Sequence, residues 1–124
     1  MTTLFFLPLL LAASGSQADS ASPPDIEVPV QATCQEYITH EPELTSRDWP
    51  REAMGKPINA YVVISYDLDG SGKAINPKVT DSKPAGVFDK TTLNILQRTK
   101  FSAEAKANGC IYVRTYGTVK RRVT

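Results

Sequence analysis

The sequence has few of the residues that catalysis or nucleic-acid binding requires. Its 124 residues include one histidine and two cysteines, and 14 Lys and Arg stand against 13 Asp and Glu. This balance argues against nucleic-acid binding, because neutralising phosphates takes a clear excess of Lys and Arg on one face. His40 lies in an acidic stretch typical of a solvated loop, and no H-E-x-x-H or G-x-S-x-G motif occurs. We therefore expect no catalytic residues, no cofactor and no metal site.

The sequence also lacks an apolar run long enough to span a bilayer, which takes roughly 20 residues. It has a shorter apolar run of ten residues, LFFLPLLLAA at 4–13, followed by small and polar residues. That order is typical of a secretory signal peptide with cleavage after Ala18. We predict a signal peptide at 1–18, an extended leader at 19–33, and one domain at 34–124, in the periplasm or secreted. An uncleaved N-terminal segment that anchors the chain in the inner membrane is the alternative.

The two cysteines are Cys34 and Cys110. In an oxidising compartment a pair of cysteines favours a disulfide, which would tie the start of the domain to its last segment. The alternative is a thiol enzyme that uses one of them as nucleophile. The absence of a C-x-x-C motif gives redox exchange little support.

Charge is unevenly distributed along the chain. Seven Asp or Glu occur between Asp19 and Asp48, and seven Lys or Arg occur between Arg98 and Arg122. The simplest interpretation is that the acidic front and the basic end lie close together and neutralise each other.

The order of residue types predicts the first elements of the fold. A helix is expected at 45–55, where Ser and Asp caps precede an early proline and Gly55 ends the element. Alternating β-branched and aromatic residues at 60–68 predict a strand with one buried face. That face is expected to carry Val62, Ile64, Tyr66 and Leu68.

An Asp-Gly turn within 67–73 predicts a hairpin to a returning strand at 73–81, which Pro77 makes bulged or an edge. The turn imitates half of a calcium loop, but Lys78 occupies the position of the bidentate glutamate, so a plain turn is preferred. A second helix is expected at 87–99 and a last strand at 110–119. The predicted fold is a small two-layer α+β domain, with two helices packed on a three-stranded antiparallel sheet.

The last strand is the expected binding element. The edge of a small antiparallel sheet has unpaired backbone groups that can accept an extended peptide. The tyrosines of this strand, Tyr112 and Tyr116, are expected to supply contact side chains.

The complete pattern resembles the C-terminal domain of TonB, from Trp49 to about Val119. In that family an aromatic-proline pair opens the first helix, an alternating strand ends in Asp before a turn, and Ser-x-Pro precedes a helix that starts at Phe. The segments that carry the likeness are WPREA at 49–53, YVVISYD at 61–67, DG at 69–70, SKP at 82–84, VFD at 87–89, and Phe101.

This resemblance implies a non-catalytic periplasmic domain whose final strand pairs with a short peptide of an outer-membrane receptor, the TonB box. The partner-binding residues implied by position are Trp49, Pro50, Ile111, Tyr112, Val113, Arg114, Thr115, Tyr116 and Gly117. A self-associating periplasmic module, in which two copies pair as a homodimer, is the alternative, beside the thiol enzyme. We expect no nucleic-acid partner and no transmembrane helix once the signal peptide is removed.

Overall fold

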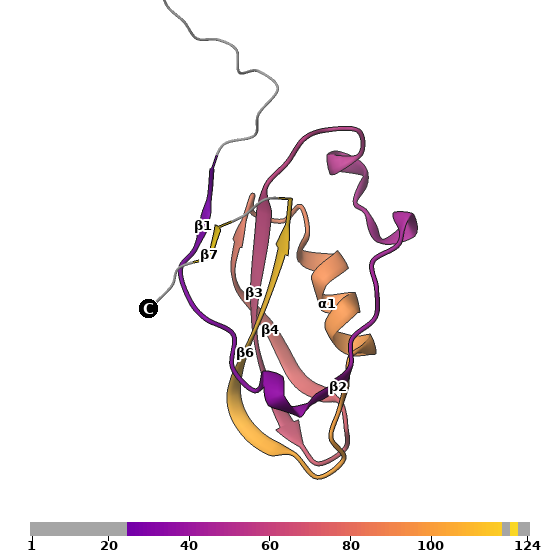
Figure 1. Ribbon diagram of the computed structural model, residues 1–124, viewed down its shortest axis with the longest axis vertical. Helices are drawn as coiled ribbons and strands as arrows, with labels where there is room; N and C mark the ends of the chain where they lie inside the picture. Colours follow the sequence, from indigo (N-terminus) through magenta and orange to yellow (C-terminus); the bar gives the residue numbers. More distant parts are fainter. Residues whose placement is uncertain (1–24, 118–119, 122–124) are drawn as a thin grey trace, which may run out of the picture.

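The computed structural model describes residues 25–117 and 120–121. The predicted signal peptide at 1–18 lies outside these residues. The centre of the fold is an antiparallel sheet with strand order β4-β3-β6. Its strands are β3 (Ala60–Asp69), β4 (Ala74–Lys83) and β6 (Lys106–Tyr116), and the helix α1 (Asp89–Arg98) covers one face (Figure 1). The predicted α+β domain with an antiparallel sheet is confirmed.

Two short sheets, which the sequence did not predict, extend this centre. β1 (Glu27–Val28) pairs in parallel with β7 (Lys120–Arg121), and β2 (Ile38–His40) pairs antiparallel with β5 (Lys100–Phe101). The first pair joins a segment before the central sheet to one after it, and the second joins a segment before the sheet to the stretch between α1 and β6. No helix in the described part of the chain is long and apolar enough to cross a membrane.

The main core lies between the central sheet and α1. The four alternate residues predicted for the buried face of β3 are all buried. Opposite them, the helix buries the stripe that its 3.6-residue period predicts. The members of that stripe are Phe88, Thr92, Ile95 and Leu96.

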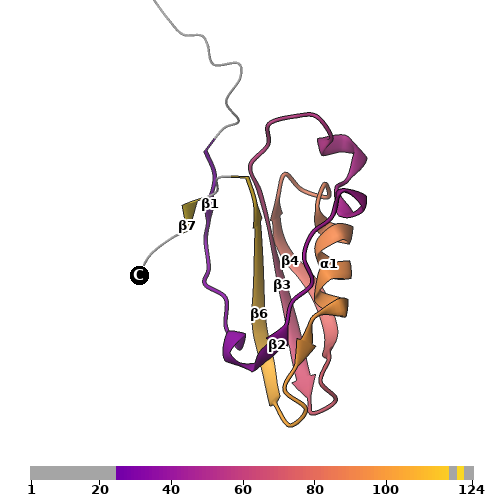
Figure 2. The ribbon, with the colours of Figure 1, turned by 45° about the vertical axis from the view of Figure 1, so that its right-hand side comes forward.

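The other face of β3 is also buried at one end, so the prediction of a single buried face is wrong there. Tyr61 and Val63 form a second cluster with Val28 and Val113. The segment from β1 onward runs beside β6 in both ribbon views (Figures 1 and 2). Val28 is 1% exposed, so this segment buries apolar surface against the sheet and thereby stabilises the fold.

The predicted helix at 45–55 is wrong. Two separate 3₁₀ turns occupy this stretch, η3 (Ser46–Asp48) and η4 (Arg51–Ala53). Trp49 between them is extended, with φ −75° and ψ 127°. The residue before a proline is pushed out of the helical region by the proline ring, so Pro50 interrupts the helix that the caps and Gly55 suggested.

The irregular returning strand is confirmed. β4 is an edge strand, and its register with β3 shifts twice, at Val63/Ile64 and at Ser65/Asp67. Near the second shift Asn76 has φ 54°, a left-handed conformation that asparagine tolerates better than most residues. Pro77, which cannot donate to a ladder, lies in this bulged part of the strand.

Long-range links join the front of the chain to its end, as the cysteines and the charge pattern predicted. Cys34 and Cys110 form a disulfide with their Cα atoms 5.7 Å apart. Glu41 pairs with Arg114 at 2.8 Å, and Asp48 pairs with Arg98 at 3.2 Å.

Candidate partner-binding edge of β6

The central sheet has two edge strands that differ in their suitability for pairing. β4 is interrupted by its bulges and by Pro77, features that protect an edge from added strands. β6 pairs with β3 without a register shift from Cys110 to Tyr116. Its outer edge is therefore the regular one.

The contacts of Ile111 show which groups of β6 point outward. Its carbonyl oxygen accepts a hydrogen bond from the Thr33 N–H at 2.9 Å, and its N–H donates to Thr33 Oγ1 at 2.9 Å. Outward and inward residues alternate in an antiparallel strand, so the N–H and C=O groups of Val113 and Thr115 point the same way. Within residues 25–117 and 120–121 the structure gives these outward groups no hydrogen-bond partner.

The leader therefore bonds to one end of this edge at Ile111, and its start packs Val28 in one buried cluster with Val113. Within the described residues it makes no hydrogen bond to the outward backbone groups of Val113 and Thr115. Thr33 is held at Ile111 because its neighbour Cys34 is bonded to Cys110, the neighbour of Ile111. The seven predicted residues of the pairing strand are thus not equivalent. Ile111 already has backbone partners, and the open positions are Val113 and Thr115.

A cavity of about 270 Å³ lies beside the open positions. One wall is β6 from Ile111 to Thr115, and the other is formed by the segment between Thr33 and Glu41. Tyr66 of β3 also lines it. An occupant of the β6 edge would therefore have room for a side chain on the helix side of the sheet.

A hydrogen-bonded group centred on Glu41 forms part of this cavity. Glu41 Oε2 accepts hydrogen bonds from the Tyr112 hydroxyl and from Arg114 Nη1, the latter at 2.8 Å. Burial is the main cause that raises the pKa of Tyr112, and its bond to Glu41 adds to the shift. Tyr112 therefore stays a hydrogen-bond donor at neutral pH, and its side chain faces the core.

Tyr116 and Trp49 belong to an aromatic cluster. The Tyr116 ring stacks on Phe88 with centroids 4.0 Å apart, and its hydroxyl lies 2.7 Å from Thr92 Oγ1. Trp49 meets both rings edge-on, at 5.2 Å from Phe88 and 5.8 Å from Tyr116. The Tyr116 side chain is thus committed to the core, and the half-buried Trp49 is held against it.

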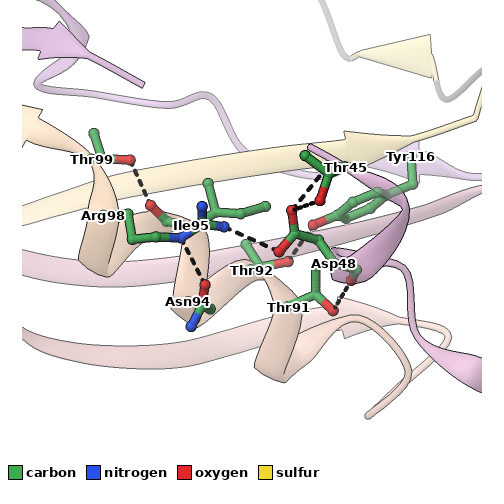
Figure 3. Close-up of polar contacts among 9 residues, drawn as sticks. All are labelled: Thr45, Asp48, Thr91, Thr92, Asn94, Ile95, Arg98, Thr99 and Tyr116. Carbon is green, nitrogen blue, oxygen red and sulfur yellow. Dashed lines mark hydrogen bonds and ion pairs between the residues drawn. The ribbon is translucent and has the colours of Figure 1, made fainter. Parts of the chain in front are cut away.

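Polar contacts fix the turn before Trp49 against α1 (Figure 3). Asp48 Oδ2 accepts hydrogen bonds from the Thr45 N–H at 2.9 Å and the Thr45 hydroxyl at 3.1 Å. The Thr91 hydroxyl donates to the Asp48 carbonyl oxygen at 2.8 Å, and Arg98 pairs with the carboxylate. The bond from the Thr45 backbone is the main cause that lowers the pKa of Asp48. The Trp49-Pro50 region is therefore held in place beside Tyr116, the last residue of β6.

Gly117, directly after β6, has a conformation that other residues rarely adopt. Its φ is +82°, and a Cβ built there would lie 2.3 Å from the Ile58 carbonyl oxygen. Both the backbone angle and the close approach require glycine at this position.

The other chemistry weighed from the sequence finds no support in the described residues. Both cysteines are in the disulfide, so the thiol-enzyme alternative has no nucleophile. In the Asp-Gly turn, Asp67 accepts hydrogen bonds from the Gly109 N–H at 2.8 Å and from the Asn76 amide at 3.2 Å, which lowers its pKa. Residues 25–117 and 120–121 hold no group of three or more His, Cys, Asp or Glu that could bind a metal ion.

Sequence reasoning selected the strand but missed three residues that shape its edge. Thr33, Glu41 and Tyr66 come from the leader, the acidic front and the middle of β3. No local motif marks them, because each acquires its position only through long-range packing.

Comparison with known proteins supports the family and the fold. The family model described as "Gram-negative bacterial TonB protein C-terminal" matches residues 45–120. A solved structure of the TonB2 protein from Vibrio anguillarum is similar, with a TM-score of 0.50 and 16% sequence identity, over 91% of this chain and 98% of that one. At that identity the likeness supports the fold alone. Curated proteins give no match.

Proposed function

Because the chain belongs to the family of TonB C-terminal domains, we propose that it binds extended peptides of outer-membrane receptors by adding a strand to β6. The family relates the domain to TonB-dependent transport. We also propose that the signal peptide at 1–18 is cleaved and that the domain works in the periplasm, where such receptor segments are accessible. The proposed role is that of a binding domain, with no catalytic step.

The observation that carries this proposal is the pair of open positions on β6. Val113 and Thr115 direct backbone donors and acceptors outward on a regular edge, next to a cavity that can take a side chain. Main-chain hydrogen bonds give affinity in strand addition, and pockets for alternate side chains give specificity. The other edge, β4, offers a bulged strand.

The proposal predicts which residues the partner touches. The contacts at β6 would be made by the backbone, because the side chains of Tyr112 and Tyr116 are buried. Arg114 is partly exposed but holds Glu41. Trp49 and Pro50, beside the end of β6, are a proposed second contact.

The test is a titration of the domain with peptides from the plugs of outer-membrane receptors, followed by the NMR shifts of backbone amides. The amides of Val113 and Thr115 are expected to shift most. A Thr115→Pro variant removes one outward N–H at a position where an edge strand tolerates proline, and it should weaken binding. The matched control, Thr115→Ala, keeps the N–H and should bind as the wild type does. If these amides stay unchanged at millimolar peptide, strand addition at β6 is wrong.

Self-association is the second candidate, because the same open edge could pair with its copy around a twofold axis. Sedimentation of the peptide-free domain separates the two. A dimer that dissociates when peptide is added would mean that both partners use β6, and a dimer unaffected by peptide would favour the structural module.

A further inference from the structure

We infer that the leader forms an autoinhibitory strap, which fills the space that a strand added to β6 needs for one of its side chains. The strap is residues 25–32, and its fixed end is Thr33, which is bonded to Ile111 beside the disulfide. This inference rests on the proposed strand addition and adds to it a competitor within the same chain. The partner peptide has to displace the strap, so its affinity is lowered by the fraction of molecules in which the strap is closed.

The strap runs beside β6 in the opposite direction to that strand. Thr33 is at Ile111, and Val28, five residues earlier, is in the same cluster as Val113. β1 then pairs in parallel with β7, the segment that follows β6. Both ribbon views show this course (Figures 1 and 2). The strap therefore lies along the part of β6 whose outward backbone groups are open.

The side chain of Val113 shows what the strap covers. β6 is an edge strand of the central sheet, yet Val113 is only 9% exposed. Tyr61 and Val63 cover it from β3, the neighbouring strand on its inner side. The remaining buried member of the cluster, Val28, comes from the strap, as do two of the partly buried residues packed against the cluster. The strap therefore fills the space beyond Val113 on this face of the sheet.

An added strand needs the same space. It would lie about 4.8 Å from β6, and its residue opposite Val113 would present its side chain on the face that carries the Val113 side chain. Val28 is 1% exposed and is therefore enclosed in that space. A close-packed cluster has no room for a second side chain of similar size. Val28 and the partner residue opposite Val113 therefore exclude each other, although the hydrogen-bonding groups of Val113 stay open.

The strap is fastened weakly enough for a peptide to displace it. Among residues 25–33, Val28 alone is buried. The β1–β7 pair is two residues long on each side, and isolated two-stranded pairs are marginally stable. At the other end the disulfide of Cys34 keeps Thr33 in place when the strap opens. The device thus has one latch, Val28, and one fixed end.

Titration of the full chain with the receptor-plug peptides tests the strap in three variants. Val28→Asp puts a charge into the buried cluster and should release the strap. Val28→Ala weakens the same latch without adding a charge, and decides the question if Val28→Asp does not fold. The matched control is Val30→Asp, which adds the same charge to the strap at a side chain that is 43% exposed.

We expect Val28→Asp to bind the peptide about 5-fold or more tightly than the wild type does, a typical coupling between two competing sites. Val28→Ala should bind with an affinity between those two, and Val30→Asp should bind as the wild type does. The amides of Val113 and Thr115 should shift in every case.

The other outcomes separate the strap from strand addition. Equal affinities of the wild type and the Val28 variants, with the Val113 and Thr115 amides still shifting, would overturn the strap and keep strand addition. Weaker binding by the Val28 variants would also overturn the strap, because Val28 would then belong to the binding surface. No shift in any variant would overturn both proposals.

Displacement also has a signature in the wild type. Because coupling is reciprocal, a peptide that binds better when the strap is open must itself open the strap. The methyl signals of Val28, which is buried in one cluster with the Tyr61 ring, should therefore move to random-coil positions at saturating peptide. The Ile111 amide should stay protected by Thr33 at the fixed end. Val28 signals that stay in place after the Val113 and Thr115 amides have shifted would overturn the inference.

Discussion

Replacing both cysteines by alanine tests how firmly the leader is attached to β6 at Cys110 and Ile111. Cys34 and Cys110 are 76 positions apart, and Cys110 is buried in the main core. A cross-link over such a distance restricts the unfolded chain and so raises the free energy of unfolding. Alanine is preferred to serine because it places no hydroxyl in the core.

The expected loss follows from the length of the closed loop. The chain-entropy relation gives about 4 kcal/mol for a loop of this size. Small domains have total unfolding free energies of about 5–15 kcal/mol, so the variant should be weakly stable. The bonds between Thr33 and Ile111 remain available to it. They have to be formed by a leader that is no longer tethered.

Urea unfolding followed by circular dichroism measures the loss, and the wild type in excess dithiothreitol is the control that should lose a similar amount. Hydrogen exchange at the Ile111 amide gives the local result, because an untethered Thr33 should protect it less. A loss below about 1 kcal/mol, with Ile111 protection unchanged, would refute the view that the disulfide holds the leader on β6.

Three further predictions concern the stability of the domain. Glu41→Ala leaves the buried Tyr112 hydroxyl without its acceptor and should cost about 1–3 kcal/mol in urea unfolding; if adding Tyr112→Phe recovers none of the loss, this reason is wrong. Gly117→Ala should cost at least about 1 kcal/mol, because φ is +82° and the new Cβ meets a carbonyl oxygen; unchanged stability would contradict the strain. The pKa values of Tyr61 and Tyr66 rise from 10.0 to about 12 on folding. The unfolded chain therefore releases these protons first, so stability should be constant below about pH 10 and fall toward about pH 12; a flat profile across that range would contradict the burial.

The parts of the fold that could be predicted from sequence are those governed by local rules. Alternation along 60–68 identified the core face of β3, and the 3.6-residue stripe identified α1. Pro77 predicted the irregular edge strand. The disulfide followed from the expected compartment and the number of cysteines, two features that do not depend on knowing the fold.

The remaining parts depend on competition between signals or on distant contacts. At 45–55 the capping residues and Gly55 favoured a helix, but the restriction that Pro50 imposes on Trp49 prevailed. The leader has no sustained period, so its packing against β3 could not be predicted. The site was found only as a strand, because Thr33 and Tyr66 reach its edge through tertiary packing.

Hydrogen exchange at three amides of β6 tests the central claim most directly. In the free domain the Ile111 amide, which donates to Thr33, should exchange slowly, and the outward amides of Val113 and Thr115 should exchange faster. When a receptor-plug peptide saturates the domain, Val113 and Thr115 should become protected while Ile111 changes little. Protection that appears on β4 instead, or none on β6 at saturation, would contradict strand addition at this edge.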